Sequence, residues 1–275
     1  MTVSTNLAVA VAQMSSGPDK KDNVAKAVTL ATQAADTGAS LIALPETFDY
    51  RGAEPDLSRV AEFLPGSALM PLMTLAKDRH VWILAGSVHE SDEAGGRPFN
   101  TSTLISPRGD IVAKYRKIHL FDIAIGDRSV TESAKYQSGD KVVSADAAGI
   151  RVGLTICYDL RFPELYRSLA DSATDLVFVP SSFTAPTGEA HWEVLLRARA
   201  IENQCFVVAP AQAGIGAGGI PTYGNSMIID PWGRVLARAS GEGEQIISAL
   251  LDLTEMARIR QNLPALHNRK IGAIR

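Results

Sequence analysis

The chain has 275 residues, of which 46% are hydrophobic, 21% charged and 6% aromatic, a composition that is typical of folded globular proteins and excludes a disordered chain. The 27 Lys and Arg residues and the 30 Asp and Glu residues give a net charge of −3. Because no run of basic residues occurs, we expect no nucleic acid partner and no binding to anionic membranes.

The N-terminal half of the sequence alternates short apolar runs with segments of helical periodicity. Asp22 is the expected N-cap of the first helix, and Pro45 ends the second apolar run. In chain order, the expected elements are a strand over 7–12, a helix over 24–34, a strand over 41–44, a helix over 68–79, a strand over 81–86, and a hairpin of strands 101–106 and 111–115.

The C-terminal half begins with a polar segment, residues 116–140, which is long for a connection and is expected to be an irregular functional loop. Repeated β-α units mixed with hairpins follow it, and they predict mixed sheets with helices outside, in one domain over residues 1–275. The elements expected after the loop are a strand over 151–156, a helix over 163–170, a strand over 176–179, a helix over 189–203, and strands over 206–209, 226–229, 235–239 and 246–253.

Targeting and redox features of the sequence indicate the cytoplasm. Lys20 is the first basic residue, so the N-terminus lacks the basic region of a signal peptide. No apolar stretch reaches the roughly 18 residues of a transmembrane helix. The only two cysteines, Cys157 and Cys205, are too few for a disulfide scaffold and favour a reducing compartment. We therefore expect a cytoplasmic protein without a membrane partner.

Cys157 is the first candidate for chemistry, because it follows a predicted buried strand at the end where α/β folds bind their ligands. A free cysteine there can also be a simple core residue. Four ionisable side chains lie within residues 158–164, however. Placing such groups beside a core strand costs free energy, which favours a functional role for them. This favours a nucleophile at Cys157, whereas Cys205 precedes an apolar run and is expected to be core.

Two further residues follow predicted strands and complement a thiol. Glu46 comes directly after strand 41–44 and Pro45, where a carboxylate either caps a loop or acts as a general base. Lys117 starts the long loop, where it is either part of a solvated basic turn or a cation that lowers the thiol pKa and stabilises an oxyanion. His119 could pair with the thiol, but no papain-like signature surrounds it, and the five histidines lack metal-ligand spacing, so we expect no metal.

Together, these motifs resemble the nitrilase superfamily of carbon–nitrogen hydrolases. The matching segments are LPE at 44–46, YRKIHL at 115–120 and ICYDLRFPE at 156–164. Further segments are similar to the Nit branch, which contains the deaminated-glutathione amidases and the ω-amidases, and residues 199–205 and 211–212 are more similar to the former. These further segments are 191–202, 223–227 and 230–233.

The resemblance implies a fold and an assembly. The fold would be an α/β, four-layer α-β-β-α sandwich with two mixed sheets in the middle, and the chain would form a homodimer through its outer helices. The family's second glutamate corresponds to Glu132, which would orient either Lys117 or the substrate and would not transfer protons. From the residues alone, Glu132 is equally well a surface carboxylate of the long loop.

The implied chemistry is amide hydrolysis through a thioester on Cys157, without a cofactor. Glu46 would move the protons, while Lys117 and the backbone amide of Tyr158 would stabilise the oxyanion. For a small carboxylate-bearing amide substrate, Arg161 is the nearest cation, although an ion pair of Arg161 with Asp159 or Glu164 is the alternative.

Phe183 and Thr187 follow strand 176–179 and, like Tyr158, are expected to line the substrate pocket. A deaminated-glutathione-like substrate is predicted. Three alternatives remain open at this point: an ω-amidase acting on α-keto acid amides, a nitrilase proper that acts on nitriles, and a catalytically idle member that serves as a scaffold.

Overall fold

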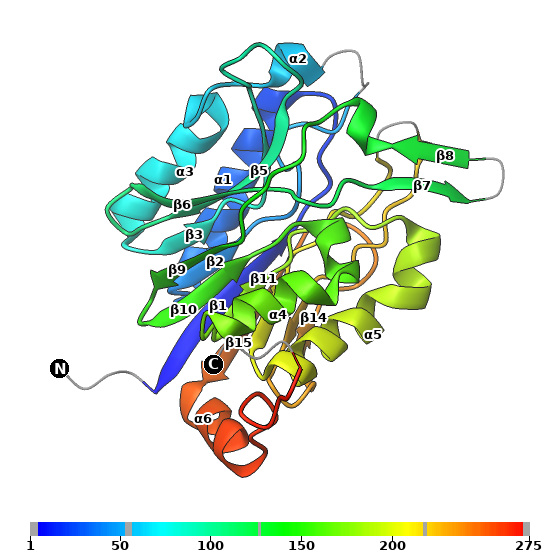
Figure 1. The fold of residues 1–275 in the computed structure, drawn as a ribbon. Coiled ribbons are helices and arrows are strands. Elements are labelled where there is room, and N and C mark those ends of the chain that lie inside the picture. The colour runs from blue at the N-terminus through cyan, green and yellow to red at the C-terminus, as the bar shows by residue number, and fades with distance from the viewer. Residues whose placement is uncertain (1–4, 53–56, 126–127, 217–218, 272–275) are drawn as a thin grey trace.

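Two β-sheets form the centre of the molecule, as seen in a computed structural model that describes residues 5–52, 57–125, 128–216 and 219–271 (Figure 1). The ends of the predicted domain, 1–4 and 272–275, lie outside the described residues. The first sheet has seven strands in the order β15 (Gln245–Asp252), β1 (Asn6–Gln13), β2 (Leu41–Ala43), β3 (Trp82–Leu84), β5 (Phe99–Ile105) and β4 (Val88–Glu90), with β6 (Ile111–Arg116) also paired to β5.

The second sheet has six strands, in the order β14 (Val235–Arg238), β13 (Met227–Ile229), β12 (Phe206–Ala209), β11 (Leu176–Phe178), β10 (Ile150–Leu154) and β9 (Val143–Ala147). Both sheets are mixed. In the first, β2 is parallel to β1 and β3, whereas β15 runs antiparallel to β1. In the second, β10, β11 and β12 are parallel, and their neighbours are antiparallel.

Helices cover the outer faces of both sheets, which gives the predicted four layers. Figure 1 shows α1 (Lys20–Asp36) and α3 (Gly66–Arg79) on one side of the two sheets, and α4 (Pro163–Asp171) and α5 (Ala185–Asn203) on the other. The other helical elements are α2 (Leu57–Val60), η2 (Glu132–Ala134), η3 (Cys157–Arg161) and α6 (Leu253–Asn262). No helix among the described residues is long and apolar enough to cross a membrane.

Strand β1 shows why the layers form. Its side chains alternate between the two faces of the sheet. Val9 and Val11 belong to the apolar cluster that also contains Val152 and Leu154 of the second sheet. Ala10 and Ala12 belong to the cluster that contains the buried side chains of α1 and α3. The sheet therefore has two buried faces, which explains why the sequences of its strands are continuous apolar runs.

The structure corrects the sequence-based elements at several places. Asp19, not Asp22, caps α1, because the Asp19 side chain accepts a hydrogen bond from the Asp22 amide. Segment 116–140 is not irregular: it contains the hairpin of β7 (Asp122–Ile125) and β8 (Arg128–Thr131), which projects from the sheets in Figure 1, and then η2. Strands β4 and β9 were not predicted, since β4 has only three residues and the sequence of β9 is small and polar.

Candidate active site

Three strands of the two sheets bring the predicted catalytic residues together. Glu46 follows β2 by three residues, Lys117 follows β6 directly, and Cys157 follows β10 by three residues. Glu132 begins η2, at the end of the β7–β8 hairpin. All four side chains line one cavity with a volume of about 1020 Å³. The structure thus places side by side four residues that are up to 111 positions apart in the sequence, from 46 to 157.

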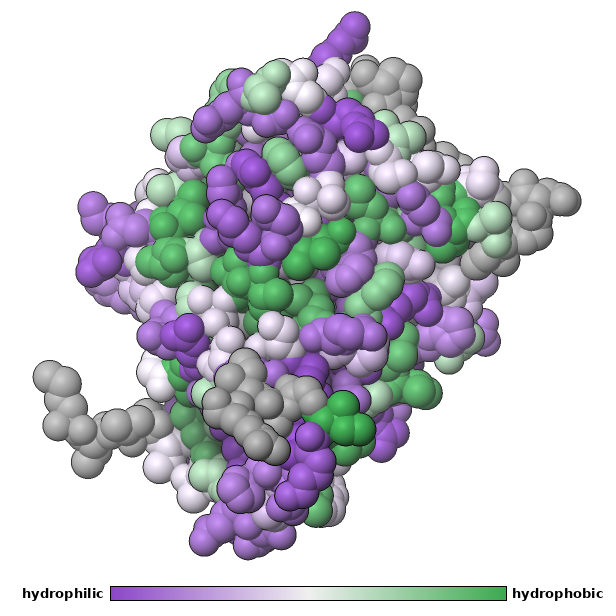
Figure 2. All heavy atoms as spheres, in the orientation of Figure 1, coloured by the Kyte–Doolittle hydropathy of each residue, from purple (hydrophilic) through white to green (hydrophobic). Residues whose placement is uncertain are grey.

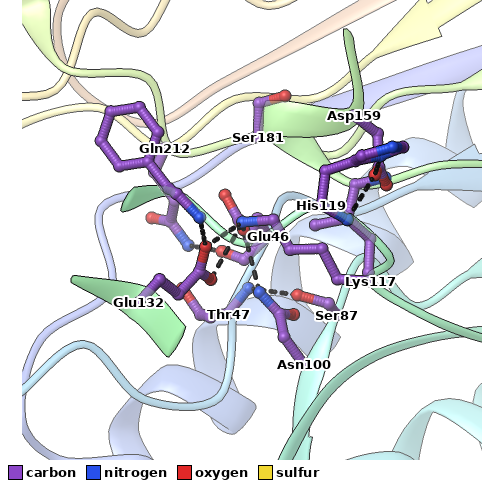
Figure 3. A network of polar contacts seen from close by, with 12 residues as sticks. Glu46, Thr47, Ser87, Asn100, Lys117, His119, Glu132, Asp159, Ser181 and Gln212 are labelled. Atoms are coloured by element: carbon purple, nitrogen blue, oxygen red, sulfur yellow. Dashed lines mark hydrogen bonds and ion pairs between the residues drawn. The ribbon is translucent and has the colours of Figure 1, made fainter. Parts of the chain in front are cut away.

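The ammonium group of Lys117 is held between two carboxylates (Figure 3). Its Nζ donates to both carboxylate oxygens of Glu132, at 2.9 and 2.8 Å, and to Oε1 of Glu46, at 3.0 Å. Lys117 is only 2% exposed. Burial alone would lower the pKa of this lysine, but Glu132, Glu46 and the neighbouring Cys157 outweigh burial and raise its pKa well above the ordinary value. Lys117 is therefore a fixed cation.

Glu46 is oriented by two side chains that sequence analysis did not assign to the site. Asn100 on β5 donates from Nδ2 to Glu46 Oε1 at 2.9 Å. Gln212 donates from Nε2 to the backbone oxygen of Glu46, also at 2.9 Å. Thr47, the next residue, has a left-handed backbone with φ of 47°. Because non-glycine residues rarely adopt this conformation, the surrounding contacts must hold the turn in place.

Cys157 lies on a similarly constrained turn. Its own φ is 49°, and its backbone amide donates to the Pro180 oxygen at 2.9 Å. The Ser182 backbone acts to lower the pKa of the Cys157 thiol, whereas the neighbouring Glu46 carboxylate acts to raise it. The thiol is buried, and burial followed by the negative charge of Glu46 raises its pKa well above the ordinary value, although Lys117 acts in the opposite direction. Lys117 thus has the expected lowering effect on the thiol pKa, but burial and Glu46 outweigh it, so the net shift is upward.

Asp159 connects the lysine segment to the cysteine turn, and its role was not foreseen. Its carboxylate is fully buried and accepts hydrogen bonds from Tyr115 Oη at 2.6 Å and from the Ile156 amide at 2.8 Å. It also contacts Nδ1 of His119 at 2.7 Å (Figure 3). The His119 ring stacks on Phe162, with ring centroids 3.7 Å apart. His119 is thus a partner of Asp159, and this arrangement gives no support for a papain-like pair.

The residues predicted to contact the substrate also line the cavity, namely Tyr158, Arg161, Phe183 and Thr187. Arg161 forms no ion pair with Asp159 or Glu164 among the described residues. Instead, its guanidinium lies 3.2 Å from His191 Nδ1 and over the rings of Tyr158 and Phe183, at 5.8 and 5.3 Å from their centroids. The alternative of a structural ion pair is therefore wrong.

The second cysteine lies away from the cavity, in the core. Cys205 is 1% exposed and lies in the main apolar cluster, so its predicted place in the core is confirmed. Burial raises its pKa to about 12. Within the described part of the chain, no group of three or more His, Cys, Asp or Glu side chains is arranged to hold a metal ion.

Comparison with known proteins places this geometry in a family. The model of the carbon–nitrogen hydrolase family matches residues 8–261, which is nearly the whole chain. The chain belongs to the carbon–nitrogen hydrolase family. Deaminated glutathione amidase of Synechocystis sp. is 43% identical to it over 266 residues, which cover 94% of this chain and 97% of that protein. Omega-amidase NIT2 of Homo sapiens is 37% identical over 267 residues, covering 97% of this chain and 96% of that protein.

Solved structures agree with this assignment. The crystal structure of the Caenorhabditis elegans NitFhit protein matches with a TM-score of 0.91 and 36% identity over 96% of this chain. The match covers 65% of the NitFhit chain, so this carbon–nitrogen hydrolase spans somewhat less than two thirds of that protein. The resemblance to the nitrilase superfamily and the predicted sandwich are confirmed. The chain is an amidase of this superfamily, a hydrolase of carbon–nitrogen bonds other than peptide bonds.

Proposed function

We propose that this protein is a thiol amidase that hydrolyses a small carboxylate-bearing amide resembling deaminated glutathione, through a thioester on Cys157. The observation that carries the proposal is the Lys117 ammonium, fixed within 3.0 Å of both Glu46 and Glu132 and electrostatically coupled to Cys157 in one cavity. This arrangement supplies a nucleophile, a base and a cation for the oxyanion without any cofactor.

The first half-reaction forms the thioester. Because the pKa of Cys157 is raised, the thiol keeps its proton at rest, and Glu46 takes that proton as the sulfur attacks the amide carbonyl carbon. The developing oxyanion is stabilised by Lys117 Nζ and by the backbone amide of Tyr158. The carbon–nitrogen bond then breaks, and protonated Glu46 gives its proton to the departing amine.

The second half-reaction releases the acid. Glu46 takes a proton from water, the hydroxide attacks the thioester carbonyl through a second oxyanion, and the carbon–sulfur bond breaks. The proton returns from Glu46 to the sulfur, which restores the thiol. Glu132 does not transfer protons in this scheme: its two hydrogen bonds with Lys117 hold the ammonium in place.

Substrate recognition is assigned to the wall next to the nucleophile. Arg161 would bind a carboxylate on the acyl part of the substrate, as a guanidinium matches the carboxylate geometry. Thr187 offers a hydroxyl, and the rings of Tyr158 and Phe183 beside the Arg161 guanidinium supply apolar walls. The name of the 43% identical relative favours deaminated glutathione, and that of the 37% identical relative keeps an ω-amide substrate as the second candidate.

One set of assays tests this proposal. Purified protein is incubated with deaminated glutathione, α-ketoglutaramate, simple aliphatic amides, N-carbamoyl amino acids and nitriles, and the kcat/KM values are compared. We expect deaminated glutathione to have the highest value. Preference for α-ketoglutaramate would identify an ω-amidase, and turnover of nitriles but not amides would identify a nitrilase proper.

Two cysteine variants test the nucleophile. Cys157→Ala should abolish hydrolysis, whereas Cys205→Ala, the matched control in the core, should keep it. Intact-mass analysis of the wild-type protein during turnover should show the acyl group on Cys157. Full activity of Cys157→Ala would contradict the mechanism, and no turnover of any compound with an unreactive Cys157 would indicate an idle scaffold.

The remaining proposals concern assembly and location. We propose a homodimer formed through α5, because Val194 and Ile201 on this helix and the nearby Trp232 are 68%, 47% and 53% exposed. Hydrophobic residues also lie exposed between hydrophilic ones on the face of the molecule that Figure 2 shows. A single domain over 1–275 and a cytoplasmic location, which keeps the thiol reduced, are part of the same proposal. Sedimentation of the purified protein tests the dimer.

A further inference from the structure

The cavity beside Cys157 is larger than a short amide requires. Its volume of about 1020 Å³ is at the upper end of the roughly 300–1,000 Å³ that is typical of small-molecule sites. A short ω-amide would occupy only a part of this space. The cavity therefore has room for a substrate with groups on both sides of the scissile bond.

Three arginines contribute to the cavity wall, and one of them, Arg97, donates a hydrogen bond to the backbone oxygen of Ser133. The other two lie at different places. Arg161 lies beside the rings of Tyr158 and Phe183, as described above. Arg51 follows the Glu46 turn, and its Nη1 donates to Gln212 Oε1 at 3.2 Å. The two guanidinium groups therefore belong to separate groups of neighbours in the same cavity.

Arg51 forms no ion pair and no hydrogen bond with a carboxylate within the described part of the chain, although it is only 8% exposed. Its other hydrogen-bond acceptor is the backbone oxygen of Ala213, at 3.5 Å, so both acceptors are neutral. The nearby carboxylates of the site already bind Lys117. Burial lowers the pKa of Arg51 to about 10, which leaves it a cation at neutral pH. Glu46 stabilises this charge from a distance, but among the described residues no carboxylate accepts a hydrogen bond from the guanidinium, so Arg51 can still bind a carboxylate of a ligand.

Arg51 is linked through Gln212 to Glu46, the residue that protonates the leaving amine in the proposed mechanism. Gln212 accepts from Arg51 and donates to the backbone oxygen of Glu46. Glu46 is also close enough to Arg51 to stabilise its charge. Gly216 packs against the guanidinium: a Cβ atom at this position would lie 2.4 Å from Arg51 Nη2. The guanidinium is thus held in one place by its surroundings.

We propose that Arg51 binds a second carboxylate of the substrate, on the leaving-group side of the scissile amide. This inference rests on the proposed function. Deaminated glutathione has one carboxylate on its acyl part, next to the keto group, and another on the glycine of its leaving part. Arg161 takes the first carboxylate, and Arg51 takes the second through the planar, charge-assisted hydrogen bonds that a guanidinium forms.

Calorimetric binding to the Cys157→Ser variant tests this inference without turnover. The two ligands are deaminated glutathione and its glycine amide, which differ only in the remote carboxylate. We expect the acid to bind about 10- to 100-fold more tightly than the amide, the range for hydrogen bonds to a charged group. Adding Arg51→Met should remove this difference. Adding Arg161→Met should weaken both ligands and keep their ratio, and the surface variant Arg79→Met should change neither.

A second variant keeps the charge and guards against misfolding. Gly216→Ala forces the Arg51 guanidinium to move, so it should reduce the acid-to-amide ratio while Arg51 is still present. An unchanged ratio in both Arg51→Met and Gly216→Ala, or equal binding of the two ligands to the Cys157→Ser parent, would overturn the inference. If the parent discriminates but the wild-type enzyme hydrolyses neither ligand, the proposed function fails and the subsite stands. If the wild-type enzyme hydrolyses deaminated glutathione but the Cys157→Ser parent binds the acid and the amide equally, the proposed function stands and the Arg51 subsite fails.

Discussion

Glu46→Gln separates the two effects of Glu46 on the reaction. Glutamine keeps an oxygen that can accept from Asn100 and Lys117, which lie 2.9 and 3.0 Å from Glu46 Oε1, so the position of the side chain is preserved. The variant removes the proton acceptor and one negative charge. General acid–base catalysis contributes about 10²- to 10⁴-fold. Because Glu46 acts in both half-reactions, we expect kcat/KM to fall by about 10³-fold or more, which corresponds to about 4 kcal/mol.

The same variant should make Cys157 more reactive toward an alkylating agent. The charge of Glu46 is the second largest cause of the raised thiol pKa, after burial. Without that charge the pKa of the thiol falls, a larger fraction is thiolate at pH 7, and alkylation by iodoacetamide becomes faster. Hydrolysis and alkylation should thus change in opposite directions, which general damage to the site would not produce.

Two measurements decide this prediction. Hydrolysis is followed as release of the dipeptide from deaminated glutathione, and alkylation of Cys157 is followed by mass spectrometry. The matched control is Glu255→Gln, which removes a carboxylate that pairs with Arg258 within α6, at the surface, and should leave both rates unchanged. Hydrolysis within threefold of the wild type would refute the role of Glu46 as the base. Slower alkylation would refute the electrostatic explanation of the thiol pKa.

Four further predictions follow from the same contacts. Lys117→Met should lower the hydrolysis rate by about 10²- to 10³-fold. It should also lower the unfolding free energy by about 3–5 kcal/mol, because it leaves the buried carboxylates of Glu46 and Glu132 unpaired. Denaturant unfolding measures this loss, and an unchanged midpoint would contradict it. Glu132→Gln should lower kcat about 10- to 100-fold with a smaller change in KM, because it loosens the ammonium; a change in KM alone would argue against this role. In the wild type, alkylation of Cys157 should keep rising with pH to above 9, as its raised pKa keeps it protonated below that, and a plateau near pH 7 would refute the raised pKa. Asp159→Asn should weaken catalysis and lower the melting temperature together, and a change in neither would show that its four contacts are dispensable.

The sequence predicted much of the site, because the site residues directly follow recognisable strands. Apolar runs ending at Leu44 and Ile156 marked the positions of Glu46 and Cys157, and the family motifs added Lys117 and Glu132. Local sequence determines these positions, since a buried strand must be apolar and the polar residue after it must lie at the edge of the sheet. The same reasoning separated Cys205 as a core residue.

Only the tertiary structure decided which charges meet and how strongly they act on one another. Asn100 and Gln212 are distant in sequence from Glu46, which they orient, and Asp159, although it lies within the cysteine motif, joins that turn to the distant Tyr115 and His119. The net direction of the Cys157 pKa shift also required the structure, because it depends on the balance between burial, Glu46 and a nearby cation. Burial and contact between distant segments are properties of the packed sheets, whereas the local sequence determines strands, turns and motifs.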